Sequence, residues 1–266
     1  MKFSVVTISF NQAEFLERTI QSVLAQREDG VELDYIIVDP GSTDGSRDII
    51  EQYRPEFSQV LLDKDNGPAD GLNKGLEKAT GDIFYYLNSD DMVAPGTFRK
   101  VADYLSAHPA VDVVFANGRF IDANDRTIRR AFSHKYVSPF LNFLDLSTLI
   151  QQSTFVRMAA IGDVRFNIAN RTCWDGEFFS DLASRGARFQ RVWDDWGWFR
   201  LHESSITVSG RFAVQYRADM ERMARAFSTM PATVRQILRF AALPIMRAFD
   251  PRYVVNRLHV LITDGK

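Results

Sequence analysis

The stretch Tyr85-Tyr86-Leu87-Asn88-Ser89-Asp90-Asp91 is the most informative part of the sequence. Its first residues are apolar and have strand character, and the run stops at two adjacent carboxylates. Open α/β sheets bind their ligands beyond the carboxyl ends of the strands. Two acids at such an edge repel each other and lose hydration unless a cation lies between them. A divalent metal would satisfy them, because it takes oxygen ligands and bridges to phosphates. The stretch therefore predicts an enzyme that handles a nucleoside diphosphate.

The residues before and just after this stretch alternate between strand and helix patterns. Strands are expected at 3–8, 33–38, 59–62, 82–87 and 111–116. The predicted helices are one that Asn11 caps, one at 46–53, one at 69–78 that Gly81 ends, and one that runs from Pro95 to about Ala107. Such alternation predicts parallel strands joined by right-handed crossovers.

Three loops at the ends of these strands are polar, namely 9–12, 39–45 and 88–91. Parallel strands present their carboxyl ends at the same edge of a sheet, so the three loops should open together. An edge rich in Asp, Ser and Asn indicates a binding site rather than a core.

The second half of the chain is less regular. Strands are expected at 126–132, 151–157 and 188–192, and a helix at 174–184. From residue 211 to 249 Met, Ala, Arg and Phe recur at helical spacing, and 251–262 is expected to form one more helix.

Composition bounds the class of protein. Of 266 residues, 45% are hydrophobic, which supports a substantial core, and the net charge of −2 argues against a general nucleic-acid binder. The single cysteine, Cys173, excludes an internal disulfide and a Cys-rich zinc site. The first residues do not resemble a signal peptide, and no window of 18 residues is apolar enough to span a bilayer. These features predict a cytoplasmic protein, with the inner face of the plasma membrane left open as a place of contact.

Short motifs in a fixed order connect these features with a known family. They are Val6-Thr7-Ile8-Ser9-Phe10-Asn11, Ile37-Val38-Asp39-Pro40-Gly41-Ser42-Thr43-Asp44-Gly45-Ser46, Asp70-Gly71-Leu72-Asn73-Lys74-Gly75, Gly81-Asp82-Ile83, Leu87-Asn88-Ser89-Asp90-Asp91, Gln151-Gln152-Ser153-Thr154-Phe155, Trp174-Asp175-Gly176-Glu177 and Phe199-Arg200-Leu201-His202. With this order and spacing, residues 3–205 resemble the family 2 inverting glycosyltransferases.

The resemblance implies an α/β fold of the GT-A type, in which helices flank a central, mainly parallel, Rossmann-like sheet. The catalytic domain would span residues 1–210, with a nucleotide-binding half at about 1–117 and an acceptor half at about 118–210. Residues 211–266 would form a helical C-terminal extension. The implied activity is transfer of a sugar from a nucleotide-sugar donor, with UDP the expected nucleotide, to a saccharide or lipid-linked saccharide, assisted by Mn²⁺ or Mg²⁺. Bacterial surface polysaccharide or glycoconjugate synthesis is the expected setting, and no nucleic-acid partner is expected.

The same resemblance assigns residues to the donor and the metal. The donor-binding set is Ser9, Asn11, Asp39, Asp70, Lys74, Asn88 and Asp90. Asp91 and His202 would contact the metal, and Asn88 stands where relatives often carry Asp. Simpler interpretations exist for several of these residues. Asp39 suits a turn and Asp44 the cap of the next helix, and Asp70 with Lys74 suits a surface ion pair. Asp90 and Asp91 could form a solvated turn, and a lone histidine is more often structural.

Asp175 is the expected catalytic base, placed at a helix start below the acceptor. The positive end of the helix dipole would lower its pKa, and Asp175 could also be the helix cap. Glu177 is the alternative base. Gln151, Gln152, Trp174 and Glu177 are expected near the sugar or the acceptor, although Trp is as often part of a core.

Two other functions remain open at this point. A nucleotidyltransferase shares this sheet architecture, but it usually has a Gly-rich basic loop after the first strand, and Ser9-Phe10-Asn11-Gln12 is neither. A non-catalytic nucleotide-sugar binding protein would bind donor without turnover. For residues 211–266, packing on the catalytic domain or a second subunit competes with an amphipathic element that docks on anionic lipid.

Overall fold

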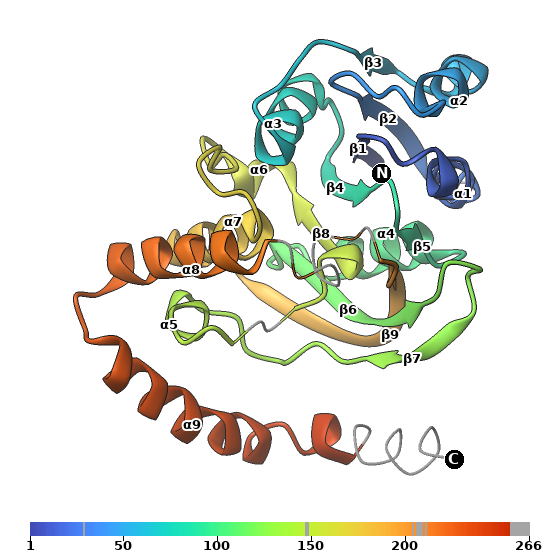
Figure 1. Ribbon diagram of the computed structural model, residues 1–266. Helices are drawn as coiled ribbons and strands as arrows, with labels where there is room; N and C mark the ends of the chain where they lie inside the picture. The colour runs from blue at the N-terminus through green and yellow to red at the C-terminus, as the bar shows by residue number, and fades with distance from the viewer. Residues whose placement is uncertain (29, 147–148, 204, 206–209, 211, 256–266) are drawn as a thin grey trace.

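The computed structural model describes residues 1–266 except 29, 147–148, 204, 206–209, 211 and 256–266 (Figure 1). Within the described residues, nine strands form one sheet in the order β3-β2-β1-β4-β8-β6-β9-β5, and β7 pairs with β6. Helices cover both faces of this sheet, so the predicted α/β architecture is confirmed.

The first half contains the predicted parallel strands. They are β1 (Lys2–Ile8), β2 (Glu32–Val38), β3 (Gln59–Leu61) and β4 (Ile83–Asn88). The helices between them are α1 (Ala13–Leu24), α2 (Ser46–Gln52) and α3 (Pro68–Lys78), with a 3-10 turn at Arg54–Glu56. The order β3-β2-β1-β4 is parallel throughout. These strands read as unbroken apolar runs because helices bury them on both faces.

The second half completes the sheet and adds the C-terminal helices. Its strands are β5 (Met92–Val93), β6 (Val113–Ile121), β7 (Thr127–Ala131), β8 (Thr154–Arg157) and β9 (Phe189–Arg200). Its helices are α4 (Thr97–Ala107), α5 (Pro139–Phe143), α6 (Met158–Ile161), α7 (Trp174–Ser184), α8 (Ala213–Phe227) and α9 (Ala232–Ala248).

This half of the sheet is mixed rather than parallel. β8 lies antiparallel between β4 and β6, and β6 pairs with β9 in parallel. Residues 151–153, expected to open a strand, form a 3-10 turn, so β8 is short. β9 continues eight residues beyond the expected end at 192 and reaches Arg200. That extension carries the chain back to the edge where β4 ends.

Two apolar cores hold the layers together, one on each face of the sheet. On the face covered by α1 and α4, Phe3 stacks on Phe98 with ring centroids 4.7 Å apart, and Tyr85 stacks on Phe155 at 4.3 Å. On the face covered by α3 and α7, Phe166 stacks on Phe178 at 4.1 Å.

Three predicted helix boundaries are wrong. Asn11 is not the cap of α1, because Gln12 takes that position and Asn11 adopts a left-handed conformation. Gly81 does not end α3, which stops at Lys78; a Cβ at Gly81 would lie 2.6 Å from the amide nitrogen of Ser4, so this glycine allows two chain segments to approach. Pro95 precedes α4 instead of opening it, because left-handed Gly96 intervenes.

The C-terminal extension is helical, as predicted. Residues 251–255 are helical, and the remainder of the predicted helix at 251–262 lies outside the described residues. Among the helices that the structure describes, none combines the length and apolarity needed to cross a bilayer.

Asp34 ties three segments together below the polar edge. Its carboxylate accepts hydrogen bonds from Ser4 Oγ and Ser58 Oγ, both at 2.6 Å, and from the amide of Thr80 at 2.8 Å. Burial raises the pKa of Asp34, but these hydrogen bonds outweigh burial and leave the pKa below its usual 3.8. The ionised form therefore stabilises the fold above about pH 4, and this contribution is lost as the pH falls through the lower pKa of the folded state.

We expect Asp34→Asn to lower the free energy of unfolding at pH 7 by about 1.5–3 kcal/mol, because hydrogen bonds to a charged group are lost. Urea unfolding checks this, and the difference from the parent should shrink as the pH approaches 3. Asp103→Asn is the control, since its exposed pair with Arg99 on α4 should contribute less than about 1 kcal/mol. A pH-independent difference would contradict the role given to the charge.

Candidate functional site

Strand register creates the site at one edge of the sheet. Ile8 of β1 is paired with Val38 of β2 on one side and with Asn88 of β4 on the other. The residues that follow, Ser9, Asp39 and Ser89, therefore leave the sheet side by side. This arrangement confirms that the loops 9–12, 39–45 and 88–91 open on a common edge.

Hydrogen bonds fasten the first two loops to each other. The amide of Asn11 donates to Ser42 Oγ at 2.8 Å, and the amide of Thr43 donates to Asn11 Oδ1 at 2.9 Å. Asp44 accepts from the amides of Ala13 and Ser46, the first residues of α1 and α2. Asp44 therefore serves the starts of two helices, one more than predicted.

Asp39 is completely buried and uses its two oxygens differently. Oδ1 accepts from the amides of Gly41 and Ser42, at 3.0 and 2.8 Å, and from Arg47 Nε at 3.1 Å. Oδ2 has no hydrogen-bond partner among the described residues. The turn interpretation of Asp39 thus accounts for one oxygen and leaves the other available to a ligand.

Asp39 is one of several buried polar groups of this kind at the edge. Within the described residues, the atoms without a hydrogen-bond partner include Ser9 Oγ, Asp39 Oδ2, Tyr86 Oη, Asn88 Oδ1 and Gln151 Oε1. A buried polar atom left unpaired costs about 1–3 kcal/mol, so such atoms are rare and call for an explanation. A polar ligand that covers the strand ends would supply the partners.

Asp91 faces into the protein. Its Oδ1 accepts from the amide of Arg200 at 2.9 Å, and its Oδ2 accepts from Gln152 Nε2 at 2.8 Å and Asn88 Nδ2 at 3.3 Å. Burial, and then the neighbouring Asp90, raise the pKa of Asp91 well above its usual range despite these donors. Protein groups therefore already use both oxygens of Asp91.

Asp90 points the other way, toward His202, which the family resemblance predicts to contact a metal. Its Oδ2 lies 3.0 Å from His202 Nε2, and the His202 ring packs on Phe15. Sequence reasoning missed the fully buried Arg200, which donates from Nε to the carbonyl of Asp90 at 2.7 Å and pairs with Asp125. The guanidinium of Arg200 therefore holds the loop by the backbone of Asp90 and is itself paired with the carboxylate of Asp125. The position of Arg200 in the same motif as His202 was the available signal.

The loop after β3 adds a further carboxylate. Asp70 accepts from the amide of Asn66 at 2.8 Å and lies 3.9 Å from Lys74 Nζ, which supports the simpler ion-pair interpretation. Asp65, not predicted, is partly buried, and burial raises its pKa; Asp39 and Asp70 are close enough to add to that shift. Asp65 follows a strand end of the same sheet edge, and this position could have identified it.

Tyr86 lies between Asp91, at the end of β4, and Asp175 of α7 in the sense that both charges act on its hydroxyl. Burial raises the pKa of its hydroxyl, and the charges of Asp175 and Asp91 raise it further. Gln151 Nε2 donates to the carbonyl of Tyr86 at 2.7 Å, which fixes the buried amide beside the ring. Asp91 and Asp175 thus lie within electrostatic range of one hydroxyl, which sequence reasoning treated only as part of a strand.

Asp175 is in the first turn of α7, and Cys173 takes the cap position. Its side chain is partly exposed, but protein surrounds it closely and burial raises its pKa. The amides of Gly176 and Asp175 itself only partly oppose this shift. The predicted lowering by the helix dipole is therefore wrong, because desolvation outweighs the dipole. A raised pKa suits a group that must accept a proton.

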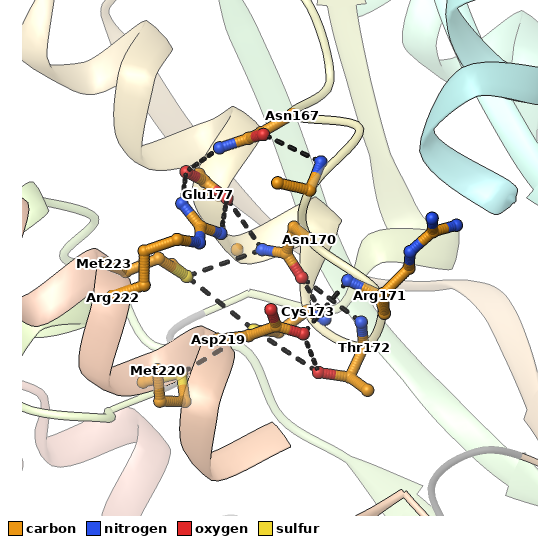
Figure 2. A network of polar contacts seen from close by, with 12 residues as sticks. Asn167, Asn170, Arg171, Thr172, Cys173, Glu177, Asp219, Met220, Arg222 and Met223 are labelled. Atoms are coloured by element: carbon orange, nitrogen blue, oxygen red, sulfur yellow. Dashed lines mark hydrogen bonds and ion pairs between the residues drawn. The ribbon is translucent and has the colours of Figure 1, made fainter. Parts of the chain in front are cut away.

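Glu177 has a different environment from the one expected for an acceptor residue (Figure 2). Arg222 of α8 donates to its two oxygens at 2.8 and 2.7 Å, and Asn167 and Asn170 donate at 2.9 and 2.7 Å. Burial raises the pKa of Glu177, but these donors outweigh it and the pKa is lowered. Both oxygens are occupied, which argues against Glu177 as base and shows that it joins α7 to α8. Trp174, expected near a sugar, is buried in the α7 core.

Comparisons of sequence place these residues in a family. The model for Glycosyl transferase family 2 matches residues 4–165. An uncharacterized glycosyltransferase of Nostoc sp. is 35% identical over 134 residues, which are 49% of this chain and 41% of the relative. A Bacillus subtilis glycosyltransferase assigned to teichuronic acid biosynthesis is 38% identical over 105 residues, 38% of this chain and 41% of that protein. The chain thus spans less than half the length of these relatives.

Solved structures share the fold at low identity. The Staphylococcus aureus protein TarS (residues 1–349, in complex with UDP-GlcNAc) has a TM-score of 0.64 at 21% identity, covering 85% of this chain and 71% of TarS. The mannosyltransferase PcManGT of Pyrobaculum calidifontis, in complex with GDP-Man and Mn²⁺, has a TM-score of 0.62 at 17% identity, covering 98% of this chain and 80% of PcManGT. The fold is therefore that of GT-A glycosyltransferases, and with a family match over more than half of its length the chain belongs to glycosyl transferase family 2.

Proposed function

We propose that this protein transfers a sugar from a nucleoside-diphosphate donor to an acceptor hydroxyl with inversion of configuration. The observation that carries the proposal is the row of buried, unpaired polar atoms along the ends of β1, β2 and β4. A ligand with several donors and acceptors would fit them, as a nucleotide sugar does. The complexes of TarS with UDP-GlcNAc and of PcManGT with GDP-Man support this class of donor.

The donor nucleoside is proposed to lie over β1 and β2. Asp39 Oδ2 would accept the ring N–H of the base, a group that both uracil and guanine carry, and UDP remains the expected nucleotide. Ser9, Asn11, Asp65, Asp70 and Lys74 surround this part of the edge. Asp65 extends the predicted donor-binding set, because its raised pKa marks a carboxyl that lies in a poorly hydrated place near Asp39.

The chemistry of Asp90 and His202 fits a divalent cation. A carboxylate and an imidazole in contact are common ligands of Mn²⁺, and Mg²⁺ also binds through one or two carboxylates plus substrate phosphates. No group of three or more candidate side chains occurs in the described residues, so a diphosphate would have to complete the coordination. Such an ion would neutralise charge on the leaving diphosphate.

The proposed metal ligand is thus Asp90 and not Asp91, the residue predicted from the sequence. Asp90 Oδ2 lies 3.0 Å from His202 Nε2, whereas Asp91 is buried and turned toward Gln152 and the Arg200 amide, from where it would support the loop from behind. Asn88 keeps an unpaired Oδ1 at the same edge and remains a proposed donor contact.

Asp175 is the proposed base. It would take the proton of the acceptor hydroxyl, whose oxygen bonds to the anomeric carbon as the bond from that carbon to the diphosphate oxygen breaks. A single displacement inverts the configuration. Gln151, with its unpaired Oε1, and Tyr86 would contact the sugar or the acceptor between Asp175 and the metal side. A bacterial surface polysaccharide is the proposed product class, in line with the teichuronic acid relative.

We expect Asp175→Asn to reduce kcat by about 10²–10⁴-fold, because the acceptor proton loses its base. Binding of UDP with Mn²⁺, measured by calorimetry, should stay within about twofold of the parent. Asp181→Asn on the same helix is the control, since Asp181 is exposed on the helix and should leave both quantities unchanged. Near-normal turnover in Asp175→Asn would refute the base, and pyrophosphate release from a nucleoside triphosphate would favour a nucleotidyltransferase.

The pH profile gives a second check on Asp175. A base acts only when ionised, so kcat/KM should fall as the pH falls through its pKa. Burial raises that pKa, which places the acidic limb above the usual 3.8 for Asp. The residual activity of Asp175→Asn should lack this limb. A limb that persists unchanged in the variant would assign the titration to another group.

The two acids at the end of β4 should separate by metal dependence. In the parent, UDP with Mn²⁺ should raise Tm above UDP alone, because a ligand at 100 times its Kd adds about 2.7 kcal/mol of stability. Asp90→Asn should abolish the increment due to Mn²⁺, whereas Asp91→Asn should retain at least half of it. The reverse pattern would identify Asp91 as the metal ligand. Asp103→Asn is the control and should behave as the parent.

A further inference from the structure

The outer face of α9 is apolar, although it lies toward solvent. Its residues recur at spacings of three and four, and they are Val234, Ile237, Phe240, Ala241, Pro244, Ile245, Ala248 and the following Phe249. The large side chains among them are 40–73% exposed. Exposed apolar surface of this extent on a soluble domain usually marks a site of interaction.

The inner face of the same helix carries the polar contacts. Arg235 donates to Glu221 of α8 at 2.7 Å, and Arg239 pairs with Asp145 after α5. Leu238, Ala242, Leu243 and Met246 pack on the cluster formed by α5 and α8. Ion pairs of its arginines and packing of its leucines therefore attach α9 to the protein, while its most apolar side is exposed to solvent. The helix lies at the periphery of the molecule (Figure 1). Rotation of α9 cannot hide that side without breaking these pairs.

A basic recess adjoins the apolar face at its end. The recess has a volume of about 320 Å³ and is lined by Lys135, Gln190, Arg191, Trp193, Phe249, Asp250, Pro251 and Arg252. Its lining carries three cationic side chains, Lys135, Arg191 and Arg252, against the single carboxylate of Asp250, which pairs with Arg191 at two points. The guanidinium of Arg252 lies 5.9 Å from the centre of the Trp193 ring.

The basic residues of the chain are concentrated in the C-terminal segment that contains α9 and part of the recess. Residues 211–266 contain ten Lys and Arg against four Asp and Glu, whereas the whole chain has a net charge of −2. An anionic surface would therefore attract the C-terminal segment and repel the remainder, which orients the molecule. A second copy would bring two basic segments together, and like charges across an interface are unfavourable.

We propose that the outer face of α9 and the adjoining basic recess dock on the surface of a bilayer that contains anionic lipid. The apolar side chains would enter the boundary between headgroups and acyl chains, and the recess would face lipid phosphates. A helix with one apolar and one charged face lies in the plane of the interface rather than across the membrane. This inference is independent of the glycosyl-transfer proposal.

Flotation of the full chain with vesicles tests the docking surface. Binding to vesicles with 30% phosphatidylglycerol should exceed binding to pure phosphatidylcholine at least tenfold at low salt and should fall in 0.5 M NaCl, because salt screens the charges. Ile237→Ser with Phe240→Ser should reduce binding at least fivefold. Lys135→Glu should reduce it at least threefold. Ile128→Ser, an exposed apolar residue on β7, is the matched control and should bind as the parent.

The variants should fold, because the altered side chains are exposed, and far-UV circular dichroism with Tm verifies this. Equal binding to anionic and neutral vesicles, or no binding to either, would overturn the proposal. Light scattering without lipid tests the alternative, in which a second copy of the chain covers the outer face of α9. A dimer that the Ile237→Ser, Phe240→Ser variant disrupts, in a parent that does not float, would assign the face to a second copy.

Discussion

The register of β1, β2 and β4 sets where the polar loops of the sheet lie. Ile8 is paired at once with Val38 and Asn88, so β1, β2 and β4 end at one level. Burial of these strands on both faces leaves no freedom to slip, because a shift of one residue would move apolar side chains out of both cores. The loops that follow must then share one edge, and their polar groups are buried there before any ligand arrives.

The polar groups at this edge of the sheet are used unequally. One oxygen of Asp39 holds the turn at Gly41 and Ser42 while the other remains unpaired. Asp91 turns inward to Gln152 and the Arg200 amide, and Asp90 turns toward His202. Some of these groups thereby fix the position of each loop, while others, such as Asp39 Oδ2 and Asn88 Oδ1, have no hydrogen-bond partner among the described residues. On the proposed function, binding would satisfy groups that the fold itself leaves unpaired.

The sequence predicted the first half of the fold well, because continuous apolar runs and intervening amphipathic helices leave few alternatives. It predicted the second half less well. The extension of β9 to Arg200 could not be read from local pattern, since Trp196 and Arg200 are buried by contacts distant in the chain. Tyr86 was missed because its importance comes from neighbours on other elements, whereas for Asp65 the strand end before it, and for Arg200 the motif shared with His202, were signals in the sequence. The direction of the Asp175 pKa shift also depended on burial, which the position at a helix start does not reveal.

Isothermal calorimetry, with UDP and GDP titrated in the presence of Mn²⁺ into the parent and into Asp39→Ala, tests whether the strand ends bind a nucleoside diphosphate. If the unpaired atoms at the strand ends mark a nucleoside-diphosphate site, either UDP or GDP should bind, with one molecule per protein chain. Asp39→Ala removes the hydrogen bond to the base and should weaken nucleotide binding at least tenfold, because a hydrogen bond to a charged group contributes about 1.5–3 kcal/mol. Binding that is unchanged in Asp39→Ala, or absent for both nucleotides in the parent, would show that these strand ends are not a nucleoside-diphosphate site.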